Sequence, residues 1–454
     1  MSHWIENAVI YAIYPLGMCG APPANDFNAA PQPRLQTLLG WTDHWHALGV
    51  NTLALGPIFE SSRHGYDTAD YFHLDRRLGT HEEFARLSAE LHARGFRILL
   101  DGVFNHVGRD FWAFRDLLSR PESSPYPGWF AGMQMGKRSP LGDPFYYEGW
   151  NGHYSLVKLN LSHSDVRGHL FQAVEYWIRE FGIDGLRLDA ADVLDPGFIH
   201  DLSQFCHGLK PEFWMWGEIV HGDYRRWANP EMLDAVTNYE CYKGLYSSLN
   251  DHNYFEIAYA LNRQFGPQGV YRGLPLFNFA DNHDVNRVAS SLKNPAHLFS
   301  LYALLFSMPG VPSVYYGSEW GIQGQRTPSS DRALRPQLDL AQASQAAPQP
   351  ALPGFLGRLA GVRRASPALQ HGDYRELVVR PEQLAFMRTC PDETVVVMLN
   401  AASSPAEVEA ALPGYGTGKA VDLLNPGETF AVRDGRLRAM ISPCGARIMK
   451  VSGE

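Results

Sequence analysis

The chain repeats one pattern between residues 8 and 320: a short apolar run, followed in most cases by a segment with helical periodicity. Apolar strands that alternate with amphipathic helices are typical of parallel sheets buried on both faces. Eight such units predict an α/β fold, a (β/α)8 (TIM) barrel with insertions. The expected strands are residues 8–15, 51–58, 97–104, 185–190, 212–219, 234–239, 274–281 and 313–320. Helical periodicity is clearest over residues 35–48, 82–93, 166–181, 255–265 and 297–308.

Three segments depart from this rhythm. Residues 107–160 are rich in Gly, Pro and aromatic residues and predict a small inserted subdomain after the third strand. Residues 341–352 read as a surface loop before a last helix over 354–365. After about residue 371, short β runs separated by turns predict a C-terminal antiparallel β-sandwich. The expected domains are the barrel (1–106 and 161–370), the inserted subdomain (107–160) and the C-terminal domain (371–454).

Charge and cysteine usage limit the partners and the location of the chain. The formal net charge is −9 and no long basic run occurs, which argues against nucleic acid and an anionic membrane as partners. No apolar run reaches membrane-spanning length, and the N-terminal residues do not resemble a signal peptide. The five cysteines are odd in number and lack a CxxC pair, which fits reduced thiols. We therefore expect a cytoplasmic protein.

Four of the expected strands end in polar clusters. In a barrel of this kind, the residues at the C-terminal strand ends face the active site. The clusters therefore predict one shared site. They are Asp101-Gly-Val-Phe-Asn105-His106, Gly185-Leu-Arg187-Leu-Asp189, Trp216-Gly-Glu218 and Phe279-Ala-Asp-Asn282-His283-Asp284.

The carboxylates in these clusters indicate glycosidic bond cleavage. That reaction commonly uses one carboxylic acid to protonate the leaving oxygen and one carboxylate to attack or stabilise the sugar. Arg187 and Asp189 share a face of one strand, and a neighbouring arginine favours the ionised carboxylate, so Asp189 is the expected nucleophile.

The expected general acid/base is Glu218. It lies in sequence among Trp214, Trp216 and Ile219, and an apolar setting would raise the pKa of its carboxyl group. Asp284, with His283 and His106, is expected to hold sugar hydroxyls.

The four clusters resemble the four signature regions of the α-amylase family, glycoside hydrolase family 13, in their residues, order and separation. The resemblance covers nearly the whole chain. It implies that Asp189 is the nucleophile, Glu218 the acid/base and Asp284 a third catalytic carboxylate. It also implies that His106, Arg187 and His283 line the sugar site at the cleaved bond. The family retains the anomeric configuration through a covalent intermediate, which implies a carboxyl separation of about 5–5.5 Å.

Further stretches resemble the neopullulanase and cyclomaltodextrinase subgroup. Leu156-Val-Lys158-Leu-Asn160 and Glu218-Ile-Val-His221 resemble two of its segments. The resemblance implies four more substrate-binding residues. These are Tyr66, which would stack on a sugar ring, His221, and the pair Asp331 and Arg335.

The chain also departs from that subgroup in three places. Its members usually carry an additional N-terminal β domain that builds a dimer. This sequence starts almost directly at the first expected barrel strand, so we expect either a monomer or a homodimer. Val220 stands where a tryptophan is common, and Ala191-Asp192 where many α-amylases have Lys-His, whose histidine carbonyl often helps to bind calcium. No cofactor is expected to be required. Asn105 is a candidate calcium ligand, with a structural hydrogen bond as the alternative role.

The main functional hypothesis is a hydrolase of α-1,4 glucosidic bonds, with α-1,6 bonds as a further candidate. A cytosolic location favours short linear or cyclic maltooligosaccharides over raw starch. A transglycosylase would use the same intermediate, with a sugar hydroxyl in place of water. A non-catalytic sugar-binding scaffold would be expected to lack a catalytic carboxylate, and all three are present. A phosphate-binding barrel enzyme would need a Gly-rich loop after the seventh or eighth strand, which Gly317-Ser-Glu-Trp-Gly matches poorly.

Overall fold

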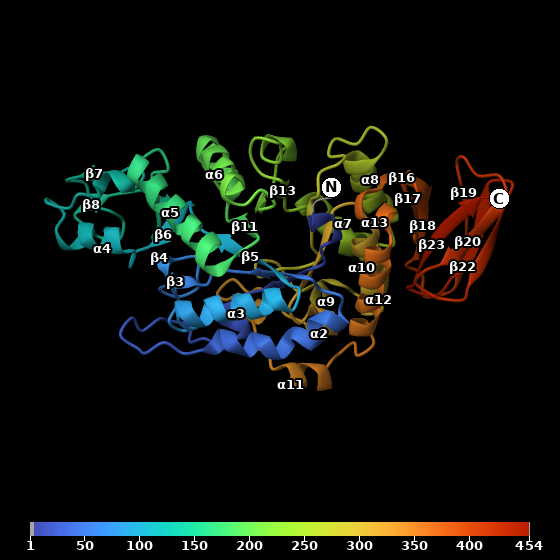
Figure 1. The fold of residues 1–454 in the computed structure, drawn as a ribbon, viewed down its shortest axis with the longest axis horizontal. Helices are drawn as coiled ribbons and strands as arrows, with labels where there is room; N and C mark the ends of the chain where they lie inside the picture. The colour runs from blue at the N-terminus through green and yellow to red at the C-terminus, as the bar shows by residue number, and fades with distance from the viewer. Residues whose placement is uncertain (1–3, 454) are drawn as a thin grey trace.

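The eight predicted strands form one parallel sheet in the structure, a computed structural model that describes residues 4–453 (Figure 1). The predicted barrel is confirmed, although each observed strand is shorter than its apolar run. The last and first strands of the sheet meet through a bridge between Thr237 and Phe277, beside which the Asn238 amide donates to the Phe277 carbonyl at 2.9 Å. In sheet order the strands are β13 (Ala235–Val236), β12 (Trp214–Gly217), β11 (Gly185–Leu188), β5 (Arg97–Gly102), β2 (Thr52–Leu55), β1 (Ile10–Ile13), β15 (Val311–Tyr315) and β14 (Phe277–Asn278).

The barrel interior is filled by side chains, so it is a core and not a channel. Alternate strand residues point inward. Trp214 and Trp216 stack with ring centroids 4.7 Å apart, and Trp216 stacks on Phe277 at 5.6 Å. The other alternate residues face the surrounding helices. These helices are α2 (Thr42–Ala47), α3 (His81–Ala93), α5 (Ser164–Phe181), α6 (Pro196–Leu209), α7 (Tyr239–Asn250), α8 (Tyr254–Phe265), α10 (His297–Ser307) and α12 (Leu352–Ala365).

Two helical predictions need correction. The segment 35–48 is not one helix, because a 3₁₀ helix over Arg34–Trp41 precedes α2. The expected surface loop 341–352 contains a short helix, α11 (Leu340–Gln345). Five of its six residues are Leu, Ala or Gln, which favour helix, and the Asp339 side chain caps it by accepting a hydrogen bond from the Gln342 amide.

The insertion after the third barrel strand is ordered and lies at one end of the molecule (Figure 1). It contains a three-stranded sheet of β6 (His106–Gly108), β10 (His153–Lys158) and β9 (Gly149–Trp150). It also contains α4 (Trp112–Ser119) and the pair β7 (Gln134–Met135) and β8 (Phe145–Tyr146). An antiparallel pair that precedes it in the chain, β3 (Phe59–Ser61) and β4 (Thr68–Leu74), carries Tyr66 in its connecting loop.

The C-terminal segment forms a single eight-stranded antiparallel sheet at the other end of the molecule (Figure 1). The sheet folds over, so that Val396 and Met398 of β18 pack against Leu437 and Ala439 of β22 in a core of their own. Its strands are β16 (Asp373–Val379), β17 (Gln383–Cys390), β18 (Glu393–Asn400), β19 (Ala406–Ala411), β20 (Gly418–Asp422), β21 (Thr429–Arg433), β22 (Arg436–Ile441) and β23 (Ala446–Gly453). The domain boundaries expected from the sequence remain a proposal.

Within residues 4–453, no helix is both long enough and apolar enough to cross a membrane.

Candidate active site

The register of three neighbouring strands brings the first polar groups together. Arg187 on β11 lies opposite Asp101 on β5 and opposite Trp216 on β12. Asp189 and Glu218 each come two residues after this level, at the C-terminal ends of adjacent strands. The predicted gathering of strand-end side chains is therefore a direct result of the parallel register.

Arg187 contacts three carboxylates at once. Its Nη1 atom lies 2.7 and 2.6 Å from the two oxygens of Asp101 and 3.3 Å from Oδ1 of Asp189. Its Nη2 atom lies 2.8 Å from Oε2 of Glu218. A guanidinium with several N–H groups in one plane can hold carboxylates on two sides.

The expected effect of Arg187 on Asp189 is outweighed. Burial raises the pKa of Asp189 well above its ordinary value, while Arg187 opposes this rise and Glu218 adds to it. Arg187 lies closer to Asp101 and Glu218 than to Asp189, so much of its charge is shared. Arg187 thus favours the ionised form of Asp189, as predicted, but burial and the neighbouring carboxylates outweigh it and the net shift of the pKa is upward.

The surroundings of Glu218 also differ from the expectation. Apart from Arg187, the partners of its carboxylate are the Ala190 amide, 3.2 Å from Oε2, and the Tyr239 hydroxyl, 3.4 Å from Oε1. Trp216 and Glu218 line one small cavity, whereas Trp214 lies deeper, at the start of β12. Hydrogen-bond donors, and not tryptophan rings, contact the carboxylate oxygens.

Asp284 is held from two sides. His283 Nε2 lies 2.9 Å from Oδ2, and Arg335 Nη2 lies 3.1 Å from Oδ1. Arg335 also contacts Asp331 at 2.9 Å, so the two predicted residues of this pair do meet. Burial alone would raise the pKa of Asp284, but the charge and hydrogen bond of His283, together with Arg335, hold it below its usual range.

Tyr66 connects Asp101 with His283. Its hydroxyl lies 3.0 Å from Oδ2 of Asp101 and 2.6 Å from Nε2 of His283. Its ring stacks on the His283 ring with centroids 5.3 Å apart. Tyr66, Asp101, His283 and Asp284 thus form a continuous chain of contacts around the site.

His106 is buried, and among the described residues its Nε2 has no hydrogen-bond partner. Burial lowers the pKa of His106 to about 4, so the ring is neutral near pH 7. Its ring lies 5.4 Å from that of Trp150 in the insertion. The side-chain amide of Asn105 lies 3.2 Å from Nδ1 of His106, which is the structural hydrogen bond considered above.

Calcium at Asn105 stays a prediction. Asn105 is buried and its amide already has His106 as a partner. Across residues 4–453 no group of three or more His, Cys, Asp or Glu side chains is arranged to hold a metal ion.

His221 is exposed on the loop after β12, where its charge lowers the pKa of Asp192. That effect is minor, because burial and the nearby Glu218 together raise the pKa of Asp192.

A small cavity of about 60 Å³ is lined by Asp101, Arg187, Glu218, Asn282 and His283. Sequence reasoning missed Tyr239, which lines this cavity and contacts both Glu218 and, at 3.4 Å, the amide of Asn282. Tyr239 ends the expected strand 234–239, so the strand-end rule would have found it had neutral side chains been considered.

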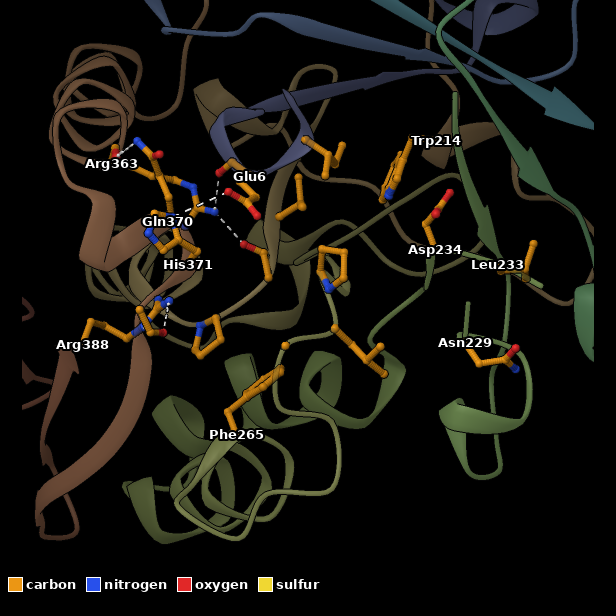
Figure 2. Close-up of a pocket in the computed structure, with 18 of the residues that line it drawn as sticks. Glu6, Trp214, Asn229, Leu233, Asp234, Phe265, Arg363, Gln370, His371 and Arg388 are labelled. Carbon is orange, nitrogen blue, oxygen red and sulfur yellow. Dashed lines mark hydrogen bonds and ion pairs between the residues drawn. The ribbon is translucent and has the colours of Figure 1, made fainter. Parts of the chain in front are cut away.

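A larger cavity, of about 390 Å³, lies at the opposite end of the barrel, beside the first residues of β12 and β15 (Figure 2). Arg363 and Arg388 lie along one wall of it. Arg363 donates to the carbonyls of Leu369 and Gly310 at 2.7 Å, and Arg388 donates to those of Ser307 at 2.7 Å and Gly372 at 2.9 Å. These guanidinium groups are engaged with the backbone, and the strand-end carboxylates lie at the other end of the barrel, so this cavity is not the candidate active site.

A closed (β/α)8 barrel with carboxylates gathered at its C-terminal strand ends has the groups that an enzyme of the glycosidase class requires. The model of the α-amylase catalytic domain matches residues 35–351, and the model of the maltogenic amylase C-terminal domain matches residues 375–448. The chain belongs to the α-amylase family of glycoside hydrolases.

Individual relatives agree with this assignment. Neopullulanase 2 of Thermoactinomyces vulgaris is 31% identical over 470 residues, which cover 98% of this chain and 78% of the relative. A cyclomaltodextrinase of Geobacillus thermopakistaniensis is 30% identical over 468 residues, covering 97% and 76%. Among solved structures, the cyclic alpha-maltosyl-(1→6)-maltose hydrolase of Arthrobacter globiformis is 28% identical with a TM-score of 0.81, covering 99% of this chain and 100% of that one.

Proposed function

We propose that this chain is a retaining hydrolase of α-1,4 glucosidic bonds in short linear or cyclic maltooligosaccharides, with α-1,6 bonds as further candidates. The observation that carries the proposal is the shared contact of Asp189 and Glu218 with Arg187 at adjacent strand ends. The names of two relatives, a cyclomaltodextrinase and a cyclic maltosyl-maltose hydrolase, support cyclic substrates.

The proposed reaction has two steps. In the first, an Asp189 oxygen bonds to the anomeric carbon as the glycosidic bond breaks, and a proton passes from Glu218 to the leaving oxygen. In the second, Glu218 takes a proton from water, whose oxygen displaces Asp189. Asp284, His283, His106 and Tyr66 would hold the sugar between them.

A substrate panel tests the activity. It would contain linear maltooligosaccharides, cyclodextrins, pullulan, panose and branched cyclic glucans. We expect cleavage of short linear or cyclic members, with the anomeric configuration retained by NMR. Product length against acceptor concentration separates hydrolysis from transglycosylation, because a transglycosylase makes longer products as acceptor increases. Inactivity on the entire panel would contradict the proposal.

Substitution of Glu218 tests the assignment of roles. Glu218→Gln should lower kcat by several orders of magnitude while the far-UV CD spectrum stays unchanged, because the amide cannot donate an acidic proton. Glu212→Gln is the matched control, since Glu212 is exposed before the start of β12. Asp189→Asn should prevent trapping of a glycosyl-enzyme. The cytoplasmic location, the monomeric or dimeric state and calcium binding at Asn105 remain predictions.

A further inference from the structure

Tyr14 is a buried aromatic residue beside the catalytic cluster that no step of the proposed reaction uses. It directly follows β1, so it lies at the C-terminal end of a barrel strand, and it is 5% exposed. Its side chain belongs to the same level of the barrel as the carboxylates.

Three different segments meet on this one side chain. The Tyr14 ring stacks on the His283 ring, with centroids 6.0 Å apart and planes 12° from parallel. The Arg335 guanidinium carbon lies 4.6 Å from the centre of the same ring. The Tyr14 hydroxyl donates to the carbonyl of His64 at 2.8 Å, in the loop that carries Tyr66.

The two residues in contact with the ring are the two that hold Asp284. His283 contacts Oδ2 of Asp284 and Arg335 contacts Oδ1. Arg335 Nε also donates to the His283 carbonyl at 3.1 Å, which links the two segments a second time. A flat ring in contact with both a histidine and a guanidinium sets their spacing, since stacking and cation–π contacts are favourable only over a narrow range of geometry.

We propose that the Tyr14 ring is a positioning residue that fixes the orientation of Asp284 through His283 and Arg335. The inference rests on the proposed function, because it assigns Tyr14 a part in catalysis through Asp284. The Tyr14 hydroxyl holds the loop that carries Tyr66, through its hydrogen bond to the His64 carbonyl, and is not needed to orient Asp284.

Three substitutions separate the ring from the hydroxyl and from packing. Tyr14→Phe keeps the ring and removes the hydrogen bond to His64. Tyr14→Leu removes the ring, and Tyr14→Met removes it while keeping a longer, unbranched side chain that adapts to the space, in case the leucine variant does not fold. Tyr374→Leu is the matched control, because Tyr374 is a buried tyrosine, 2% exposed, in the C-terminal sheet.

We expect Tyr14→Phe to stay within about threefold of the wild-type kcat. We expect Tyr14→Leu or Tyr14→Met to lower kcat about 100-fold with a much smaller change in KM, since small misplacement of a catalytic group costs about this much. Tyr374→Leu should lower the melting temperature without this loss of kcat. If a folded leucine or methionine variant keeps its kcat, or if the phenylalanine variant loses as much as they do, the inference is overturned.

A crystal structure of the leucine or methionine variant provides a readout that does not depend on activity. Arg335 and His283 should move relative to Asp284. Unchanged positions of both side chains would overturn the inference even if the wild-type enzyme proved inactive on the entire substrate panel, a result that would count against the proposed function alone.

Discussion

At the scale of single residues, the site contains more carboxylates in contact than it has arginines to neutralise them. Arg187 contacts Asp101, Asp189 and Glu218, and the charge of Asp284 also acts on Asp189. Groups that interact this strongly titrate together, so the protonation of any one depends on the others. Burial and this crowding raise the pKa of Asp189, whereas His283 and Arg335 keep that of Asp284 low against the effect of burial.

The pH dependence of the reaction should follow Asp189. A nucleophile must be ionised, and its pKa is raised, so activity should be lost on acidification at a higher pH than an ordinary aspartate would give. Asp101→Asn removes a negative charge that raises this pKa and leaves Arg187 more available to Asp189. The acid limb of kcat/KM against pH should then move to lower pH.

The control for this experiment is Asp434→Asn, which removes the same charge from the exposed surface of the C-terminal sheet. It should leave the limb in place. An unmoved or raised limb in Asp101→Asn would contradict the expectation that the charge of Asp101 raises the pKa of Asp189.

The members of the site were largely predictable from the sequence, but the upward shift of the pKa of Asp189 was not. The rule that polar strand ends share a site located Asp101, Arg187, Asp189, Glu218 and Asp284. It missed Tyr14 and Tyr239, because a neutral tyrosine at the end of an apolar run looks like part of the strand. Arg187 contacts three carboxylates, and how strongly it acts on each depends on differences in distance of a few tenths of an ångström. No pattern of residues specifies such differences.

At the scale of elements, one buried arginine joins the barrel to the C-terminal sheet, and a second joins two helices and a loop on the barrel side of that junction. Arg388 of β17 donates to the carbonyl of Ser307, the last residue of α10, and to that of Gly372. Arg363 of α12 donates to Leu369 in the helix α13 (Pro367–His371) and to Gly310. Carbonyls at helix C-termini lack intrahelical partners and carry partial negative charge, so a guanidinium is well suited to them.

Removal of one of these arginines should lower stability without affecting the chemistry. Arg388→Met leaves the Ser307 and Gly372 carbonyls buried and unpaired, at a cost of about 1–3 kcal/mol per unsatisfied group. Relief from burying a charge offsets part of this cost, since burial lowers the pKa of Arg388 to about 9. We expect a lower midpoint of urea unfolding with kcat unchanged, and no such shift for the exposed Arg438→Met. An equal or higher midpoint for Arg388→Met would show that charge burial dominates.

The elements themselves follow from the sequence to different degrees. Apolar runs and helical periodicity predicted all eight barrel strands, because burial on both faces leaves a strong pattern. The short helix α11 was missed, because its six residues are too few for periodicity and depend on the cap at Asp339. The folding of the C-terminal sheet onto itself depends on contacts between distant strands, which local patterns do not carry.

At the scale of the whole molecule, the barrel and the C-terminal sheet share one apolar core. The side chains that β17 and β18 turn toward the barrel, Leu384, Phe386, Val395, Val397 and Leu399, belong to the same buried cluster as the barrel helices. A shared core of this kind couples the unfolding of its two parts.

We therefore expect barrel and sheet to unfold at one temperature. All eleven tryptophans precede residue 321, so tryptophan fluorescence reports on the barrel side alone. Alkylation of the buried Cys444 during heating, measured by mass spectrometry, reports on the sheet, and the buried Cys241 is its counterpart in the barrel. The three midpoints should coincide. Labelling of Cys444 well below the fluorescence transition would contradict a shared core.

The bridge between Thr237 and Phe277 has a consequence for hydrogen exchange. It joins β13 and β14, which are two residues long, so few amide bonds close the ring at this point. Local opening is expected where few hydrogen bonds join two strands. The amides of residues 235–238 should therefore exchange with deuterium faster than those of 52–55 in β2. Tyr239 lies just beyond this junction and contacts both Glu218 and Asn282. The acid/base side of the site would then be able to fluctuate on its own while the nucleophile side stays fixed.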